Sequence, residues 1–363
     1  MNKKINVTET FLPDIFEYQK ILSRSWEKKW ITNRGELVCE LEDKIKKNYH
    51  ISNLILTTNG TLPLQIAIKT LNLEGEIITT PFSYIATTSS IIWEGCKPVY
   101  TDIDKDTFNI NPDLIEAKIT SKTVAIIATH VFGNPCEINK IDAIAKKHNL
   151  KIIYDAAHSF GTEYLDKSTF EYGDISTCSF HSTKIFHTGE GGALFTNDEE
   201  LYSKLFYHHN FGHKGQENFH GLGINAKMSE LQAAMGLSVF PYFDDILAKR
   251  KTLYKLYQKE LKDNVTFQKI NSDCKYNYAY IPVIFNSEQE LLTCKDKLND
   301  NNIFPRRYFY PSLNTIEYIN GSKMAVSESI SKRILCLPLY YNLSEMEVIK
   351  ISTLIVKTLN DVK

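Results

Sequence analysis

The chain has 363 residues, of which 43% are hydrophobic and 23% are charged, and its formal net charge is −1. This length predicts more than one folding unit, and the near-zero charge gives no support for nucleic acid or an anionic membrane as a partner. No apolar run is long enough for a signal peptide or a bilayer-spanning helix, so we expect a cytoplasmic protein.

The first part of the chain alternates strand and helix patterns. Residues 1–30 are polar with isolated apolar positions, which predicts an N-terminal arm and a short helix. The strands that follow are apolar throughout, as is typical of a mostly parallel sheet covered on both faces. In chain order we expect helix 37–49, strand 53–58, helix 62–71, strand 76–80, helix 86–93, strand 97–101, helix 113–119, strand 124–129, helix 138–148 and strand 151–155.

The pattern changes beyond about residue 240. Here we expect helix 241–261, strand 276–285, helix 287–301, strands 303–308 and 335–339, and helix 344–359. Strands with helices grouped to one side predict a smaller α+β domain. The predicted division is an arm and helix at 1–30, a large α/β domain at 31–240 and a small C-terminal domain at 241–363.

Cysteine and histidine spacing does not predict a metal site. The seven cysteines are scattered and odd in number, which indicates reduced thiols. The histidines of one segment match no zinc spacing and stand among loop-forming residues, namely His208, His209, His213 and His220. We therefore expect no metal ion.

Polar residues gather where the expected strands end. Strand 53–58 breaks at Asn59-Gly60-Thr61 before a helix, a pattern that can hold a phosphate but more often only caps the helix. Strand 151–155 ends on Asp155, and Lys184 follows in a polar turn before a glycine cluster. Taken alone, Lys184 could be one more solvated lysine. A carboxylate and an amine at one sheet edge are, however, the two protein groups that a pyridoxal phosphate (PLP) enzyme needs.

With these segments in order, the chain resembles the nucleotide-sugar aminotransferases of the DegT/StrS type, which are fold-type I PLP enzymes. The resemblance runs over almost the whole length. Its carriers are Asn59-Gly60-Thr61, Pro81 to Thr87, Gly95 to Val99 with Asp102, Gly133-Asn134-Pro135, Asp155 to His158, Ser179 to Lys184, Gly189 to Gly192 and Gly223 to Met228. It implies a seven-stranded-type sheet in the large domain and a homodimer whose sites lie across the interface.

The resemblance also implies roles for single residues. Lys184 would form the Schiff base with PLP, and Asp155 would pair with the pyridine nitrogen. The cofactor would be held further by Gly60, Thr61 and Ser179 at its phosphate, Tyr84 on its ring and Asn225 from the second subunit. The chain departs from the family pattern twice. His158 replaces the usual Gln near the phenolic oxygen of the cofactor. It could form a hydrogen bond to that oxygen, although a polar residue at a helix start is the alternative. Ala226-Lys227 replaces Tyr-Arg, and a lysine does not reproduce the bidentate contact of an arginine.

The segment after residue 303 is the candidate for substrate binding. Its Arg306, Arg307, Tyr308 and Tyr310 could meet a diphosphate and a sugar or base, although a core strand with a surface Arg pair is the alternative. The run looks like that of enzymes that aminate C4 of a dTDP-4-keto-6-deoxyhexose, with glutamate as the usual donor. We therefore expect dTDP-4-dehydro-6-deoxy-D-glucose to become dTDP-4-amino-4,6-dideoxyglucose.

Two alternatives stay open. The enzyme could aminate C3 of a dTDP-3-keto-6-deoxyhexose, or the chain could be a PLP-binding regulator without turnover. Related PLP enzymes that dehydrate sugars carry His at the Lys184 position, so this lysine favours amino transfer.

Overall fold

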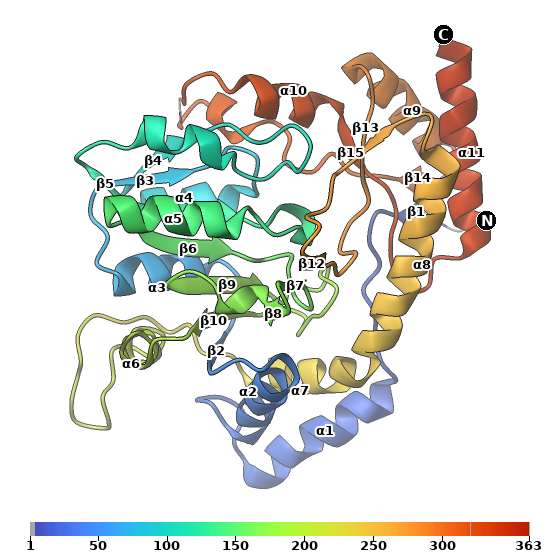
Figure 1. Cartoon of the computed structure of the whole chain (residues 1–363). Coiled ribbons are helices and arrows are strands. Elements are labelled where there is room, and N and C mark those ends of the chain that lie inside the picture. The colour runs from blue at the N-terminus through green and yellow to red at the C-terminus, as the bar shows by residue number, and fades with distance from the viewer. Residues whose placement is uncertain (1–3, 320, 363) are drawn as a thin grey trace.

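A seven-stranded sheet forms the centre of the first two thirds of the chain (Figure 1). The computed structural model describes residues 4–319 and 321–362. The strands lie in the order β2-β10-β9-β6-β5-β3-β4. Their bounds are β2 (Asn53–Thr57), β3 (Glu76–Thr79), β4 (Lys97–Tyr100), β5 (Thr123–Thr129), β6 (Lys151–Asp155), β9 (Ile175–Ser179) and β10 (Gly192–Thr196).

Only β10 runs against its neighbours in this sheet. The predicted mostly parallel seven-stranded sheet is therefore confirmed. Because β2 and β9 are both antiparallel to β10, they run in the same direction. The carboxyl ends of β2, β3, β6 and β9 consequently lie at one edge of the sheet.

Helices cover both faces of this sheet, and their bounds are α2 (Glu36–Tyr49), α3 (Leu62–Thr70), α4 (Ile85–Trp93), α5 (Ile138–His148), α6 (Glu199–His208) and α7 (Glu230–Val239). Neighbouring strand residues alternate between the two layers. Ile152 and Tyr154 pack into the cluster of α5, whereas Ile153 packs into the cluster that contains residues of α3, α4 and α6. Burial on both faces explains why the strands read as continuous apolar runs.

One element of this region was predicted wrongly. The expected helix 113–119 is instead two short 3₁₀ turns, η1 (Pro112–Leu114) and η2 (Glu116–Lys118). Ile115 is fully buried, but Leu114 is 41% exposed. The segment thus lacks the apolar face of several residues that would stabilise an α-helix.

A smaller antiparallel sheet lies in the C-terminal part, in the order β11-β13-β15. The elements there are α8 (Phe243–Leu261), β11 (Thr266–Phe267), β12 (Cys274–Lys275), β13 (Pro282–Ile284), α9 (Glu288–Asp300), β14 (Ile303–Phe304), α10 (Ala325–Arg333), β15 (Ile334–Cys336) and α11 (Glu345–Val362). Side chains of α8, α9 and α11 form one core with β13 and β15. The expected strands 276–285 and 303–308 are much shorter than predicted. Tyr278, with a φ of 53°, interrupts the first of them.

Segments that are far apart in sequence pair with each other. Strand β1 (Ile5–Asn6) lies parallel to β14, and β12 pairs with β7 (Glu163–Tyr164), whose other neighbour is β8 (Lys167–Ser168). Helix α1 (Ile15–Lys28) packs against α7. The division of the chain at residues 30 and 240 stays a prediction.

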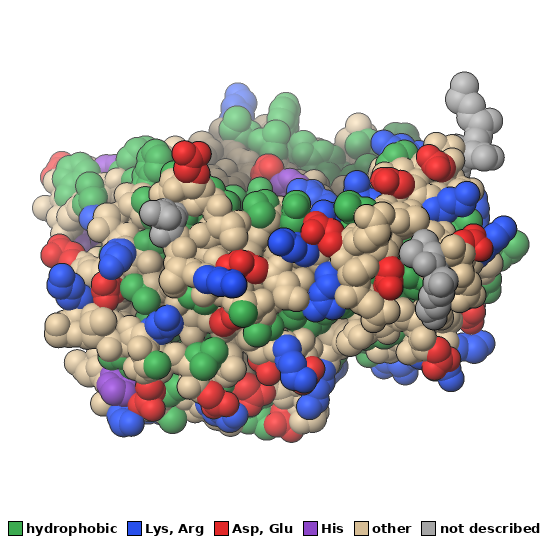
Figure 2. All heavy atoms as spheres, turned by 90° about the horizontal axis from the view of Figure 1, so that it is seen from above, with side chains coloured by type: hydrophobic (Ala, Val, Ile, Leu, Met, Phe, Trp, Pro, Cys, Tyr) green, Lys and Arg blue, Asp and Glu red, His purple; other side chains and the backbone are tan. Residues whose placement is uncertain are grey.

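The surface carries mixed charge. On the face seen in Figure 2, Lys and Arg side chains alternate with Asp and Glu side chains, without a large region of one sign. Within residues 4–319 and 321–362, no helix combines the length and the apolar character that crossing a bilayer requires.

Candidate active site

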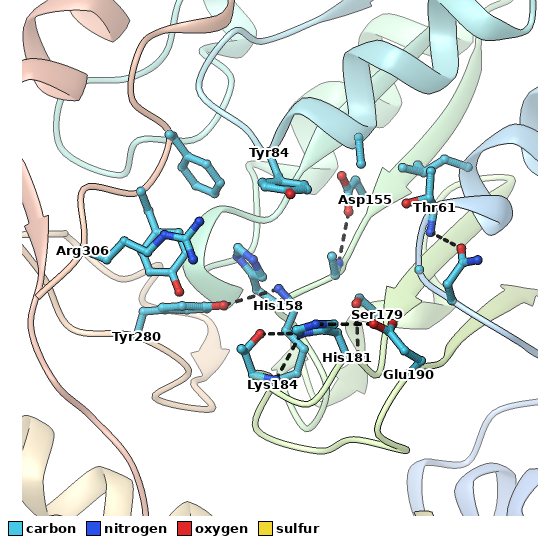
Figure 3. Close-up of a pocket in the computed structure, with 18 residues that line it drawn as sticks. Thr61, Tyr84, Asp155, His158, Ser179, His181, Lys184, Glu190, Tyr280 and Arg306 are labelled. Atoms are coloured by element: carbon cyan, nitrogen blue, oxygen red, sulfur yellow. Dashed lines mark hydrogen bonds and ion pairs between the residues drawn. The ribbon is translucent and has the colours of Figure 1, made fainter. Parts of the chain in front are cut away.

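A cavity of about 240 Å³ lies where the large sheet presents the carboxyl ends of β2, β6 and β9 (Figure 3). Most of the predicted site residues line it, namely Gly60, Thr61, Tyr84, Asp155, His158, Ser179, Lys184, Arg306 and Tyr308. Three predicted residues do not line it, namely Asn225, Arg307 and Tyr310. Residues up to 250 positions apart in sequence therefore meet at one sheet edge, roughly as the rule for α/β sheets predicts.

Asp155 ends β6 as a buried carboxylate, 5% exposed. Its Oδ2 accepts a hydrogen bond from Thr87 Oγ1 at 2.5 Å, and its Oδ1 accepts one from the Ala157 amide at 3.2 Å. Burial raises the pKa of Asp155, and the Thr87 hydroxyl only partly offsets that rise. No cationic side chain of the described residues lies within ion-pair distance of it. This carboxylate is suited to a positively charged N–H group entering from the cavity.

Lys184 lies in the loop that follows β9, with its amine in the cavity. The loop is folded by local contacts: the Lys184 amide donates to the His181 carbonyl at 2.8 Å, and His181 Nδ1 lies 2.8 Å from Thr183 Oγ1. Burial lowers the pKa of Lys184 to about 8, and the Asp155 carboxylate opposes that change. The amine is therefore partly neutral, and so nucleophilic, at physiological pH.

Gly60 and Ser179 bring the first turn after β2 against the end of β9. A Cβ on Gly60 would lie 2.6 Å from Ser179 Cβ, so the close approach requires glycine. The side-chain contacts of this turn agree with the helix-capping alternative, and the phosphate site stays a prediction. The amides of Thr61 and Leu62 both donate to Asn59 Oδ1 at 2.9 Å, because Asn59 caps α3.

His158 lines the same cavity from the turn after Asp155. It is 7% exposed, and burial lowers its pKa well below the ordinary value, so the ring is neutral. Its Nδ1 is buried without a hydrogen-bond partner within the described residues. The described residues thus supply no partner for this buried ring nitrogen.

The two neighbouring arginines point to different surroundings. Arg306 lines the cavity and lies over the Tyr308 ring, with 4.8 Å from Cζ to the ring centroid. Arg307 instead pairs with Glu288 at 2.6 Å and donates to the Lys332 carbonyl at 2.9 Å. It also covers the ring of Tyr310, which is 45% exposed. The structure thus brings only Arg306 and Tyr308 of the predicted substrate residues into the cavity.

Asn225 lies outside this cavity, on the exposed loop 209–229 between α6 and α7 (Figure 1). Its Oδ1 accepts a hydrogen bond from Lys227 Nζ at 2.8 Å, and Lys227 in turn lies over the Phe211 ring. Within one subunit the loop therefore does not bring Asn225 to the other predicted phosphate residues.

Sequence reasoning did not single out several lining residues, among them His181, Glu190, Tyr280 and Phe309. His181 Nε2 lies 3.5 Å from Glu190 Oε1 at the cavity wall. Glu190 stands inside the glycine cluster, so the motif itself could have indicated it. Tyr280 and Lys184 are 96 positions apart, and only tertiary packing brings them together.

The lining residues fit pyridoxal phosphate. Asp155 offers a buried carboxylate for the ring nitrogen and Lys184 an amine for the aldehyde, and the His158 side chain lines the same cavity. The turn at Gly60 places backbone against Ser179 at the amino end of α3, where a phosphate is favourable. In the described part of the chain, no three His, Cys, Asp or Glu side chains gather in a way that could hold a metal ion.

Comparisons with known proteins agree with this chemistry. The model of the DegT/DnrJ/EryC1/StrS aminotransferase family matches residues 15–356. The chain is 39% identical to dTDP-4-amino-4,6-dideoxy-D-glucose transaminase of Shigella dysenteriae over 376 aligned positions, which cover 100% of both chains. Its identity to the Escherichia coli protein of the same name is 34%, over 98% of each chain.

Solved structures show the same architecture. The crystal structure of DesI in the presence of its TDP-sugar product has a TM-score of 0.94 and 27% identity, with 99% of this chain and 94% of that chain covered. The resemblance inferred from the sequence motifs is thereby confirmed. The chain belongs to the DegT/DnrJ/EryC1/StrS aminotransferase family, and it is a PLP-dependent aminotransferase.

Proposed function

We propose that this enzyme transfers the amino group of glutamate to C4 of dTDP-4-dehydro-6-deoxy-D-glucose. The products are 2-oxoglutarate and dTDP-4-amino-4,6-dideoxyglucose, so that one amine and one carbonyl exchange places. The observation that carries the proposal is the cavity in which Lys184 and Asp155 meet beside Arg306. Full-length identity of 39% to a transaminase named for this amino sugar supports the choice of substrate.

Bound pyridoxal phosphate supplies a sink for the electrons that remain when a proton leaves the carbon beside the transferred nitrogen. The carboxylate of Asp155 would hold the ring nitrogen in its protonated form. Its burial makes it a strong partner for a cation, since neither group is then shared with water. Thr87 and the Ala157 amide fix its two oxygens, so that the carboxylate cannot turn away.

Lys184 would hold the cofactor covalently and move the proton once its amine is released. A pKa lowered by burial to about 8 leaves a much larger part of the free amine neutral near pH 7.5 than the roughly one part in a thousand of an ordinary lysine. The same amine can take a proton from one carbon and return it to another as the neighbouring general acid. Tyr84, across the cavity from Lys184 in Figure 3, would cover the ring face.

Arg306 would bind the diphosphate of the nucleotide sugar. It is exposed at the cavity rim, carries no ion-pair partner among the described residues and stacks on Tyr308. A planar guanidinium can contact two phosphate oxygens at once, which suits a diphosphate better than an ammonium does. Away from Arg306 in Figure 3, Glu190 and His181 offer an acceptor and a ring nitrogen for sugar hydroxyls.

We further propose a homodimer in which Asn225 completes the phosphate site of the second subunit. Two features support this. The middle of the loop 209–229, which carries Asn225 near its end, extends away from the rest of the subunit (Figure 1), and its Phe219 and Leu222 are each 65% exposed. Exposed apolar side chains on a protruding loop favour burial against another chain.

The reaction itself is tested with the purified enzyme, PLP, glutamate and dTDP-4-dehydro-6-deoxy-D-glucose. We expect 2-oxoglutarate and a sugar whose new C–N bond is located at C4 by NMR. An amine at C3, formed from a 3-keto isomer, would refute the regiochemistry. Failure of glutamate and of other amines to convert the bound cofactor to its amino form would refute enzymatic turnover altogether.

The shared site is tested by mixing two inactive variants, Lys184→Ala and Asn225→Ala. If Asn225 acts on the partner's cofactor, each mixed dimer has one site with both residues intact. Random exchange should then restore about a quarter of the wild-type activity, because half of the dimers are mixed and each has one working site. Activity no higher than that of the separate variants would contradict action in the second subunit.

A further inference from the structure

Tyr280 lies directly beside the amine of Lys184. Lys184 Nζ donates to Tyr280 Oη at 3.4 Å, and the same Nζ lies 5.9 Å from the centroid of the Tyr280 ring. Tyr280 is 4% exposed and stands in the segment between β12 and β13, far in sequence from the loop of Lys184. The C-terminal part of the chain thus contributes the nearest hydroxyl to the reactive lysine (Figure 3).

The backbone on the amino side of Tyr280 forms hydrogen bonds with two buried side chains. Arg250, 6% exposed on α8, donates from Nε to the Tyr278 carbonyl at 3.1 Å and from Nη2 to the Ala279 carbonyl at 2.5 Å. Asn277 Oδ1 accepts from the Ala279 amide at 3.1 Å. Among the described residues Arg250 has no carboxylate in ion-pair range. The hydrogen bonds of its buried guanidinium go to the Tyr278 and Ala279 carbonyls instead.

Asn277 also ties this segment to the turn that carries His158. Its Nδ2 donates to the carbonyls of His158 at 2.7 Å and of Phe160 at 2.9 Å. Gly133 makes room for this contact, because a Cβ there would lie 2.6 Å from Asn277 Oδ1. The glycine of the Gly133-Asn134-Pro135 motif therefore serves the placement of Tyr280.

The ring of Tyr280 is fixed from two sides. Its centroid lies 4.7 Å from that of His158 and 5.2 Å from that of Tyr308. Rings packed in this way leave the hydroxyl little freedom. Burial raises the pKa of Tyr280 far above its ordinary value, so the phenol stays protonated and its oxygen remains a neutral acceptor.

We propose that Tyr280 is the acceptor that holds the Lys184 amine whenever that amine is not bonded to the cofactor, and that Arg250 and Asn277 position Tyr280 for this task. The inference rests on the role proposed above for Lys184. During the reaction the amine must leave the cofactor, wait close to the reacting carbons and return. A fixed hydroxyl 3.4 Å away gives the released side chain one preferred place.

The contact has a consequence for the titration of Lys184. A hydrogen bond that the ammonium donates stabilises the charged form, so Tyr280 opposes the effect of burial on the lysine. Loss of the hydroxyl should lower the pKa of Lys184 below its value of about 8. The other ionisable groups that act on this amine are Asp155, His158, Cys178, Tyr84 and Arg306.

The test uses cofactor-free protein, whose free Lys184 amine is labelled with acetic anhydride between pH 6 and 10 and followed by peptide mass spectrometry. In Tyr280→Phe the pH of half-maximal labelling should fall by roughly half to one unit, as expected from one hydrogen bond. Tyr278→Phe is the matched control, because its ring belongs to the same segment but makes no contact with Lys184. We expect the control to keep the wild-type profile.

Equal profiles for Tyr280→Phe and wild type would overturn the inference, as would an equal fall in the Tyr278→Phe control. Arg250→Lys provides a second variant. It keeps the Tyr280 hydroxyl but loses the pair of hydrogen bonds to the Tyr278 and Ala279 carbonyls. Its profile should shift in the same direction by a smaller amount, and an unchanged profile would remove Arg250 from the proposal. These readouts need no sugar substrate, so failure of the proposed amino transfer would be seen separately.

Discussion

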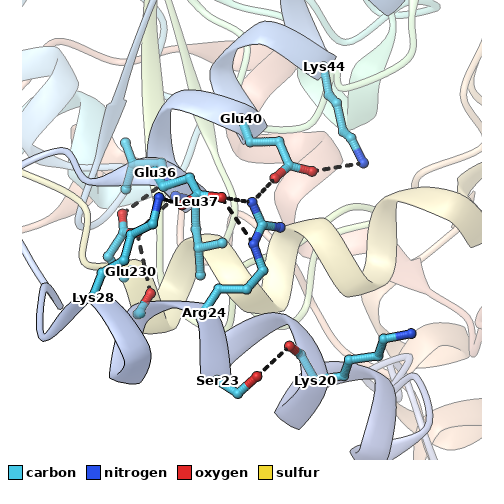
Figure 4. A network of polar contacts seen from close by, with 11 residues as sticks. Lys20, Ser23, Arg24, Lys28, Glu36, Leu37, Glu40, Lys44 and Glu230 are labelled. Atoms are coloured by element: carbon cyan, nitrogen blue, oxygen red, sulfur yellow. Dashed lines mark hydrogen bonds and ion pairs between the residues drawn. The ribbon is translucent and has the colours of Figure 1, made fainter.

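Glu230 carries a stability prediction that the structure allows to be worked out in detail. Its side chain is 1% exposed and accepts the amides of Leu37 at 2.8 Å and Val38 at 3.0 Å, in the first turn of α2 (Figure 4). Gly35 precedes this helix and has no side chain that could cap it. A Cβ on Gly35 would lie 2.7 Å from Glu230 Cδ, so the glycine leaves space for the carboxylate. Glu230 therefore caps α2 from a distant part of the sequence.

Glu230→Gln keeps the shape but removes the charge and one of the two acceptor oxygens. One amide of α2 then faces an NH₂ group instead of an acceptor. A lost hydrogen bond to a charged group is worth about 1.5–3 kcal/mol, and the lost charge at the helix N-terminus about 0.3–1 kcal/mol. The free energy of unfolding should consequently fall by about 2–4 kcal/mol, and by more in Glu230→Ala, which leaves both amides without an acceptor.

Urea unfolding of the cofactor-free protein measures this loss, and hydrogen exchange over residues 36–41 locates it. The matched control is Asp43→Asn on the same helix, because Asp43 lies beyond the first turn, is 75% exposed and, among the described residues, pairs only with Lys46 at the surface. We expect the control to unfold almost like wild type. If Glu230→Gln stays within about 0.5 kcal/mol of wild type and its exchange is unchanged, the reasoning about the helix cap fails.

The remaining predictions concern the cavity. Arg306→Gln should raise the KM for the nucleotide sugar about 10- to 100-fold through loss of a charge-assisted contact. Arg307→Gln should mainly lower stability, because Arg307 forms an ion pair with Glu288. Equal effects of the two variants on KM in steady-state kinetics would contradict this. Gly60→Ala should weaken PLP binding about tenfold or more in an absorbance titration, because an added Cβ would lie 2.6 Å from Ser179 Cβ. Binding as tight as in wild type would disprove this. Lys184→Ala should fold, but borohydride should no longer fix the cofactor to the chain; a persisting adduct would identify another lysine. Without cofactor, Asp155→Asn should melt at a higher temperature than wild type at neutral pH. Burial raises the pKa of Asp155 in the folded state above the ordinary value of 3.8, so the unfolded chain ionises at lower pH than the folded chain. The free energy of unfolding of wild type therefore falls as pH rises from the unfolded-state pKa to the folded-state pKa, and this loss is complete above the folded-state pKa. The gain should disappear near pH 3.8, and a lower melting temperature than wild type at neutral pH would refute the sign.

The elements around the large sheet could be predicted because their patterns are local. Helix 138–148 and strand 151–155 were placed with the bounds that the structure has. The strand is buried over most of its length, and Asn149 ends the helix in the left-handed conformation. Helix α7 was not predicted from the sequence. Seven of its residues are buried around its circumference, so its sequence lacks the alternation of an apolar and a polar face that indicates a helix.

The site could be predicted only where residues follow a strand end. Asp155 and Lys184 were found in this way, and both line the cavity. Arg307 was grouped with Arg306 because neighbours in a supposed strand give no sign of which one meets an acid. Glu288, the partner of Arg307, lies 19 positions earlier and on another element. Tyr280 gave no signal at all, since its place depends on Arg250 and Asn277.

The pairing of β1 with β14 joins residues 5–6 to residues 303–304. During synthesis the ribosome therefore makes one strand of this pair almost first and the other almost last. Until its partner emerges, the amino-terminal segment must stay unpaired, and closure of this long loop belongs among the late steps of folding. Because Arg306 follows β14 by two residues, a bulky fusion near the amino terminus should disturb the part of the cavity that Arg306 lines before it disturbs Lys184.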